Sequence, residues 1–98
     1  MQYVIKAYDG ENMLEKHMQV RAAHLENLKT IDGKILCGGG LLDENGNMKG
    51  SVLVLEVDDK SKLDAYLESE PYIKSGVWQK IEVDPMNVVI VGGEKVGK

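Results

Sequence analysis

The chain has 98 residues, of which 43% are hydrophobic and 29% charged, so it is long enough for one globular domain with a modest core. Its formal net charge is −4, and interleaved lysines and glutamates leave no basic stripe, which argues against a nucleic-acid partner. The first residues lack the order of a signal peptide, and no apolar run approaches the roughly 20 residues of a membrane span. A single cysteine, Cys37, excludes an internal disulfide. We therefore expect a cytoplasmic protein without a membrane partner, in which Cys37 is a buried small hydrophobe.

The first expected elements are a strand and an amphipathic helix. Residues 2–8 are rich in Tyr, Val and Ile and stop at Asp9-Gly10, which predicts a strand followed by a turn. Residues 13–29 contain no Gly or Pro and consist mostly of good helix formers. The apolar positions spaced by three and four predict the buried stripe of this helix, made of Leu14, Met18, Ala22, Leu25 and Leu28.

Both histidines of the chain lie on this predicted helix. His17 and His24 are seven residues apart, so they lie on nearly the same side and about 10 Å apart along the axis. His24 neighbours Leu25 in the apolar stripe and is expected to point partly inward, whereas His17 is expected to be solvated. The spacing is too long for one shared metal ion and no third ligand is evident, so we expect no metal.

A hairpin with a glycine-rich first strand follows. Residues 34–42 contain Gly38-Gly39-Gly40, and three glycines in a strand favour a bulge, or else a close approach of a ligand to the backbone. The run does not match a Walker A loop or a dinucleotide fingerprint, so it indicates no cofactor. Asn45-Gly46 predicts the hairpin turn. Residues 49–57 form the returning strand, whose apolar run Val52–Leu55 suggests that both faces are covered.

The second half of the chain predicts a helix and a final strand. Asp58–Ser61 caps a helix over 62–69, and Pro71 ends it and opens a short turn. Residues 77–84 alternate as a strand does. We expect one domain over residues 1–91, with a short last strand at 87–91 and a mobile polar tail at 92–98.

This order predicts a ferredoxin-like α+β fold, β-α-β-β-α-β, with an antiparallel sheet and both helices on one face. The other face is either solvated or covered by a second subunit, and Val52–Leu55 favours the second option. An RNA-binding module shares this order, but it needs aromatic residues on the central strands. Residues 50–57 contain none, so we set that class aside.

Four segments resemble one known family in order and separation, from Tyr3 to about Pro85. Arg21-Ala22-Ala23-His24-Leu25 resembles the Arg-x-x-His-Leu of the YciI-like (YCII-related) family. The family's glycine-containing second strand resembles residues 36–42, and the opening of its third strand resembles Gly50-Ser51. Its Asp-Pro-Tyr…Gly-Leu segment resembles Glu70-Pro71-Tyr72 followed by Gly76-Val77.

The resemblance implies a fold that dimerises through its sheet faces into a closed α/β barrel, with a His–Asp pair in a cleft beside the first helix. Carried over to this sequence, the histidine is His24 and the carboxylate is Glu70, where the family pattern has aspartate. Glutamate keeps the charge but adds a methylene group, which displaces the carboxylate. It is also expected to cap the short turn after Pro71 poorly.

Two functions of different classes follow. The first is a small cytosolic homodimeric enzyme without cofactor, in which the histidine moves a proton on a small cyclic or carbonyl-bearing substrate, in lyase- or isomerase-type chemistry. The second is a non-catalytic dimeric module that binds a small metabolite or a partner, favoured by glutamate at the family's aspartate position. The predicted site comprises a catalytic pair and four ligand-binding positions: His24 and Glu70, then Arg21, Tyr72, Gly39 and Gly40.

The three charged or titratable candidates also have structural interpretations. His24 could be a half-buried histidine that bonds a backbone carbonyl, and Arg21 a surface arginine paired with a glutamate. Glu70 could be a solvated residue at a helix end.

Overall fold

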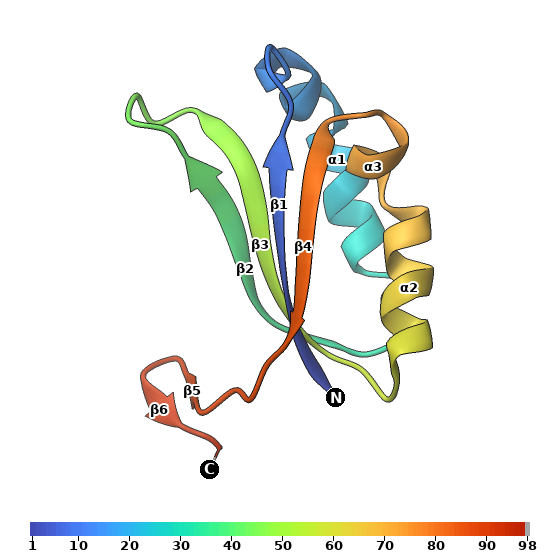
Figure 1. Cartoon of the computed structure of the whole chain (residues 1–98), viewed down its shortest axis with the longest axis vertical. Coiled ribbons are helices and arrows are strands. Elements are labelled where there is room, and N and C mark those ends of the chain that lie inside the picture. The colour runs from blue at the N-terminus through green and yellow to red at the C-terminus, as the bar shows by residue number, and fades with distance from the viewer. Residues whose placement is uncertain (98) are drawn as a thin grey trace.

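The computed structural model describes residues 1–97 as a sheet with all its helices on one face (Figure 1). In chain order the elements are β1 (Gln2–Asp9), α1 (Leu14–Leu28), β2 (Lys34–Leu42), β3 (Met48–Glu56), α2 (Lys60–Ser69), α3 (Pro71–Lys74), β4 (Trp78–Pro85), β5 (Ile90–Val91) and β6 (Glu94–Lys95). The predicted β-α-β-β-α-β order is therefore confirmed, and the short turn after Pro71 is a one-turn helix, α3.

The main sheet has the order β2-β3-β1-β4, and each neighbouring pair is antiparallel. β1 lies in the middle, where Ile5 pairs with Leu53 of β3 and Val83 of β4. This is the ferredoxin-like α+β arrangement predicted from the order of elements. It places the start of the chain at the centre of the sheet.

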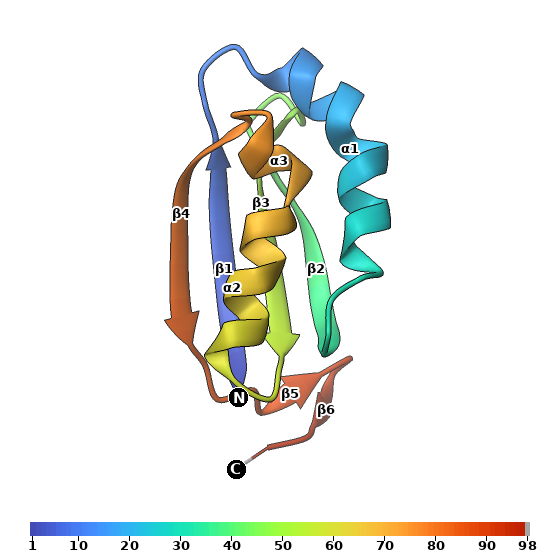
Figure 2. The same ribbon diagram turned by 90° about the vertical axis from the view of Figure 1, so that its right-hand side faces the viewer.

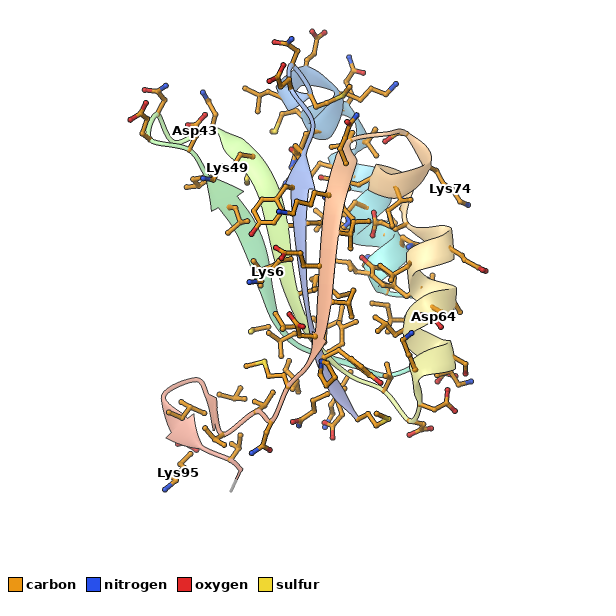
Figure 3. All side chains as sticks on the ribbon, in the orientation of Figure 1. Lys6, Asp43, Lys49, Asp64, Lys74 and Lys95 are labelled. Atoms are coloured by element: carbon orange, nitrogen blue, oxygen red, sulfur yellow. The ribbon has the colours of Figure 1, made fainter. Side chains whose placement is uncertain are left out.

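The core lies between the sheet and the helices. Ile5 and Ala7 of β1 and Leu55 of β3 alternate with residues of the opposite face and are at most 1% exposed. Leu63 of α2 packs into the same cluster and is fully buried. Lys6, between Ile5 and Ala7, projects from the face without helices (Figure 3). That second face is called the open face below.

The predicted buried stripe of α1 is wrong except at Leu28. Leu14, Met18 and Leu25 are 39%, 54% and 41% exposed. The inward-facing residues are instead Met13, His17, Val20, His24 and Leu28. Apolar periodicity misplaced the stripe because it counts histidine as polar, whereas here both histidines point into the protein.

Strand β2 has register irregularities between Ile35 and Cys37 and between Leu41 and Leu42, whereas the three glycines, where a bulge was expected, pair regularly with β3. After the first irregularity, Cys37 pairs with Val54, which itself pairs with Val4 on the open face. Cys37 is therefore exposed, and the expectation of a buried cysteine is wrong. The first irregularity shifts the register so that Gly38 and Gly40 face the helices.

The C-terminal residues also differ from the expectation of a polar tail over 92–98. Glu94–Lys95 pairs with Ile90–Val91 in a separate two-stranded sheet that extends beyond the main sheet (Figure 1). Lys98 lies outside the described residues. Within residues 1–97, none of the helices has the length and apolar character needed to cross a membrane.

Candidate active site

The helices and the sheet enclose a pocket of about 290 Å3 between α1, β2, β3 and α3. Figure 2 shows α1 running beside α2 and α3, with the sheet behind them. The polar lining of the pocket comes from His17, Arg21, His24, Ser51 and Tyr72. Leu25, Leu28, Ile35, Met48 and Leu53 supply the apolar lining. A volume near the lower end of the usual range suits a small ligand.

The three glycines of β2 form one wall of this pocket. A Cβ atom at Gly38 would lie 2.6 Å from Leu53 Cδ2, and one at Gly40 would meet Met48 Sδ. A Cβ at Gly39 would meet nothing within 4 Å. The strand carries no side chains at these three positions along the pocket, and the predicted ligand-binding positions Gly39 and Gly40 border it.

The structure brings His24 and Glu70 together, although they are 46 residues apart. His24 Nδ1 lies 2.8 Å from Glu70 Oε1 in a buried contact, and Glu70 is 0% exposed. A carboxylate only accepts hydrogen bonds, so Nδ1 carries the proton and Nε2 is left as the free nitrogen of the ring. Neither the backbone-bonded reading of His24 nor the solvated reading of Glu70 holds.

Two further donors satisfy the buried Glu70 carboxylate. The Tyr66 hydroxyl donates to Oε2, and the Tyr72 backbone N–H donates to Oε1 at 3.0 Å. Burial and the contact with Glu70 raise the pKa of Tyr66 well above its usual range, so the hydroxyl keeps its proton as a donor. Three hydrogen bonds offset much of the cost of burying a carboxylate.

Glu70 is also the N-cap of α3, contrary to the expectation that glutamate caps poorly. Its extended backbone is the geometry favoured before Pro71, and its side chain folds back to accept the Tyr72 N–H. The same oxygen, Oε1, accepts from this N–H and contacts His24 Nδ1. The local turn and the long-range pair thus fix the same carboxylate.

The pocket holds a second histidine–carboxylate pair. His17 Nδ1 lies 2.6 Å from Asp9 Oδ2, and the two side chains are only 3% and 5% exposed. The expectation of a solvated His17 is therefore wrong. Burial raises the pKa of Asp9, and the charge and hydrogen bond of His17 oppose that shift. The sequence signal was present, because a residue seven positions from an inward-facing one shares its helix face.

Tyr72 lies against both imidazoles. Its ring centroid is 4.6 Å from that of His17 and 4.4 Å from that of His24, in stacked geometry. Trp78 packs against this group, with its centroid 5.7 Å from His24 in an edge-on contact. Burial raises the pKa of Tyr72 to about 12, against an opposing effect of the Arg21 charge. The predicted ligand-binding Tyr72 lines the pocket, and its raised pKa keeps the hydroxyl protonated at neutral pH.

Arg21 lies on α1 one turn from each histidine and lines the pocket. Its side chain is exposed, and no salt bridge within residues 1–97 involves it. The surface reading, in which Arg21 pairs with a glutamate, is not seen. Its guanidinium is available to an anionic oxygen of a ligand.

The described part of the chain contains no group of three or more His, Cys, Asp or Glu side chains placed to hold a metal ion. The two histidines both stack on Tyr72, and each is hydrogen-bonded to its own carboxylate. What the arrangement offers chemically is therefore two oriented imidazoles, a tyrosine hydroxyl and an arginine around one pocket.

The fold and site together define a small ferredoxin-like α+β protein with a histidine–carboxylate pair beside its first helix. This chain belongs to the YCII-related domain family, which it matches over residues 1–87. It is 32% identical to the protein YciI of Escherichia coli O6:H1 over 97 residues, covering 91% of this chain and 99% of that protein. An uncharacterised protein of Haemophilus influenzae is 31% identical with the same coverage.

Solved structures give the same result for the fold. The 5-chloro-2-hydroxyhydroquinone dehydrochlorinase TftG of Burkholderia phenoliruptrix, in complex with 2,5-dihydroxybenzoquinone, has a TM-score of 0.79 and 26% identity. That alignment covers 88% of this chain and 93% of TftG. A putative antibiotic biosynthesis monooxygenase from Bacteriodes thetaiotaomicron has a TM-score of 0.61 at 11% identity, over 94% and 91% of the two chains, and shows the fold alone.

Proposed function

We propose that this protein is a small cytosolic homodimeric enzyme that uses the His24–Glu70 pair to transfer protons on a small cyclic or carbonyl-bearing substrate. The reaction class is lyase- or isomerase-like. The observation that carries the proposal is the buried 2.8 Å contact between Glu70 and an imidazole that lines the pocket. An acid–base group held in this way typically contributes about 10²–10⁴-fold to a rate.

Each side chain has a role in this chemistry. His24 accepts or donates a proton at Nε2, since Nδ1 is bonded to Glu70. Glu70 holds the ring in one orientation and balances the imidazolium charge once the proton has moved. Arg21 and Tyr72 bind a substrate oxygen that carries or develops negative charge, through a guanidinium and a protonated hydroxyl.

The similarity to TftG supports a hydroxylated six-membered ring as the substrate. TftG is described as a dehydrochlorinase and is bound to a dihydroxybenzoquinone. Loss of hydrogen chloride from a ring compound needs proton transfer and a leaving group, without an organic cofactor. The groups around the pocket of this chain supply proton transfer and anion binding, which is the chemistry such a reaction requires.

A non-catalytic ligand-binding role is the second candidate. The observation that favours it is glutamate at the position where the family pattern has aspartate. The same pocket and the same arginine would then hold a ligand without converting it.

A substrate assay separates the two candidates. Wild type, His24→Gln and Glu70→Gln would be tested with 5-chloro-2-hydroxyhydroquinone for chloride release, and with 2,5-dihydroxybenzoquinone for binding. All would carry Cys37→Ser, because the exposed thiol can add to quinones. Lys16→Gln, an exposed change on the same helix, is the control.

We expect His24→Gln to lower chloride release by about 10²–10⁴-fold, with Lys16→Gln unchanged. Binding of the quinone without any turnover by wild type would favour the binding module. If wild type neither binds the quinone nor releases chloride, both candidates are overturned for this class of ring compound.

A further inference from the structure

The His17–Asp9 pair has the same construction as the His24–Glu70 pair. In each, a buried carboxylate of another element contacts Nδ1 of an α1 histidine, at 2.6 and 2.8 Å. Asp9 comes from the end of β1 and Glu70 from the start of α3. Both imidazoles line the same pocket, and in both Nε2 is the nitrogen that the carboxylate leaves free.

Both imidazoles stack on the Tyr72 ring, which comes from α3. Their helix positions are two turns apart, or about 10 Å along the axis. Each ring nevertheless stacks within 4.6 Å of the one tyrosine ring. The Nδ1 atom of each imidazole is held by its own carboxylate, so each ring has its Nε2 atom left to act on a ligand in the pocket.

We propose that His17 is a second catalytic residue of the pocket and Asp9 its positioning residue, so that one histidine acts as acid while the other acts as base. This inference rests on the proposed function and narrows its substrate class. The class is a cyclic, enolisable ketone with a carbon–carbon double bond in the ring. In such a compound, the atoms that lose and gain protons lie several bonds apart.

The reaction is balanced without an oxidant or reductant. In the first step, the neutral imidazole takes a proton from the carbon between the carbonyl group and the double bond. The electron pair of the broken C–H bond forms a new double bond to the carbonyl carbon. The carbonyl oxygen receives the electron pair of the C=O double bond and takes the Nε2 proton of the imidazolium, which gives a dienol. In the second step, the first imidazole, now protonated, donates to the far alkene carbon, and the other takes the dienol O–H proton. The product is the conjugated ketone, and both imidazoles return to their initial protonation states.

Arg21 lies between the two histidines on α1, one turn from each, and lines the pocket. It is placed to stabilise the negative charge that develops on the substrate oxygen during each step. The groups around His17 are Asp9 from β1, Tyr72 from α3, and Arg21 from its own helix. Burial raises the pKa of Asp9, and one of its oxygens, Oδ1, has no hydrogen-bond partner in residues 1–97. A buried carboxylate kept at this cost fits a working group better than a packing element.

The test follows the isomerisation of cyclohex-3-en-1-one to its conjugated isomer by ultraviolet absorbance, over a range of pH. Wild type should give a bell-shaped pH profile, because the rate needs one neutral and one protonated imidazole. His17→Gln should lower kcat by about 10²-fold with KM nearly unchanged, and should remove one limb of the bell. All variants carry Cys37→Ser, because the conjugated product can react with the exposed thiol.

Two further variants keep the result interpretable. Asp9→Asn retains an acceptor for His17 and guards against misfolding of His17→Gln; it should lower kcat less than His17→Gln does. Lys16→Gln should behave as wild type. If His17→Gln keeps the bell-shaped pH profile and the wild-type kcat while His24→Gln loses activity, the inference on His17 is overturned and the proposed function stands. Activity that survives in both histidine variants, or no isomerisation by wild type, would overturn the proposed function for this class as well.

Discussion

At the scale of single residues, the site depends on buried polar groups whose hydrogen bonds come from distant parts of the chain. Glu70 accepts from the side chains of His24 and Tyr66 and from the backbone of Tyr72. Each donor that is removed leaves a buried acceptor unsatisfied, which costs more than an ordinary hydrogen bond contributes. The stability of the fold and the geometry of the site are therefore linked through one carboxylate.

Replacing Tyr66 by phenylalanine tests this link. The change keeps the buried ring but removes the hydroxyl that donates to Glu70 Oε2. We expect the free energy of unfolding, measured by urea denaturation, to fall by about 1–3 kcal/mol. Tyr8→Phe, on a partly exposed residue, is the matched control and should change it by less than about 0.5 kcal/mol. Equal stabilities of the two variants would show that the Glu70 network does not stabilise the fold.

At the scale of elements, a local signal in the sequence fixes where α2 begins. Asp59 is the N-cap of α2, and its side chain accepts from the Ser61 N–H at 2.9 Å. The hydrogen bond from the Ser61 hydroxyl is the main cause that lowers the pKa of Asp59 below its usual value. The capping interaction thus favours the charged carboxylate.

The sign of the pH effect follows from this lowered pKa. The folded state prefers the ionised cap, so its stabilisation is full above the ordinary pKa of aspartate, near 3.8, and is lost as the pH falls through the lower folded value. Asp59→Ala should therefore reduce the melting temperature at neutral pH and reduce it less in strong acid. Circular dichroism melts would measure this. Asp59→Asn caps the helix without a charge, so its melting temperature should fall below that of wild type only at pH values where Asp59 is ionised. An Asp59→Ala deficit that is the same at both pH values would contradict the assignment.

At the scale of the whole molecule, the helices cover one face of the sheet and leave the open face to solvent or to a partner (Figure 1). Val52 and Val54 of β3 point to this face, because they alternate with Leu53 and Leu55, which pack against the helices; Val52 is partly exposed, whereas Val54 is only 8% exposed. Apolar side chains in the middle of a sheet face, beside Lys6, are typical of a surface that a second subunit covers. We propose that the protein dimerises through the open face.

Val52→Lys tests the proposed dimer. A lysine in the middle of the open face would bring two charges into a subunit interface, so we expect monomers in sedimentation velocity experiments where wild type forms dimers. Val52→Thr keeps the size and β-branched shape and should dimerise more weakly than wild type but better than Val52→Lys. A wild type that sediments as a monomer would refute the dimer. An unchanged dimer in Val52→Lys would place the interface elsewhere.

The sequence by itself determined the order of the elements, because turn, cap and breaker residues act locally: Asn45-Gly46 set the hairpin and Pro71 separated α2 from α3. The resemblance to the family indicates His24 and Glu70 from their local motifs, without information on the contact between them.

Only the tertiary structure decided which face of α1 is buried. Apolar spacing favoured the face with Leu14 and Met18, but the histidines point inward because carboxylates from other elements bind them. Asp9 reads in the sequence as a turn residue, and it becomes the partner of His17 only when β1 ends beside the start of α1. A buried polar residue needs its partner, because removing one member leaves the other buried and unpaired. When the two members come from distant segments, neither segment shows a periodic pattern that predicts the pair.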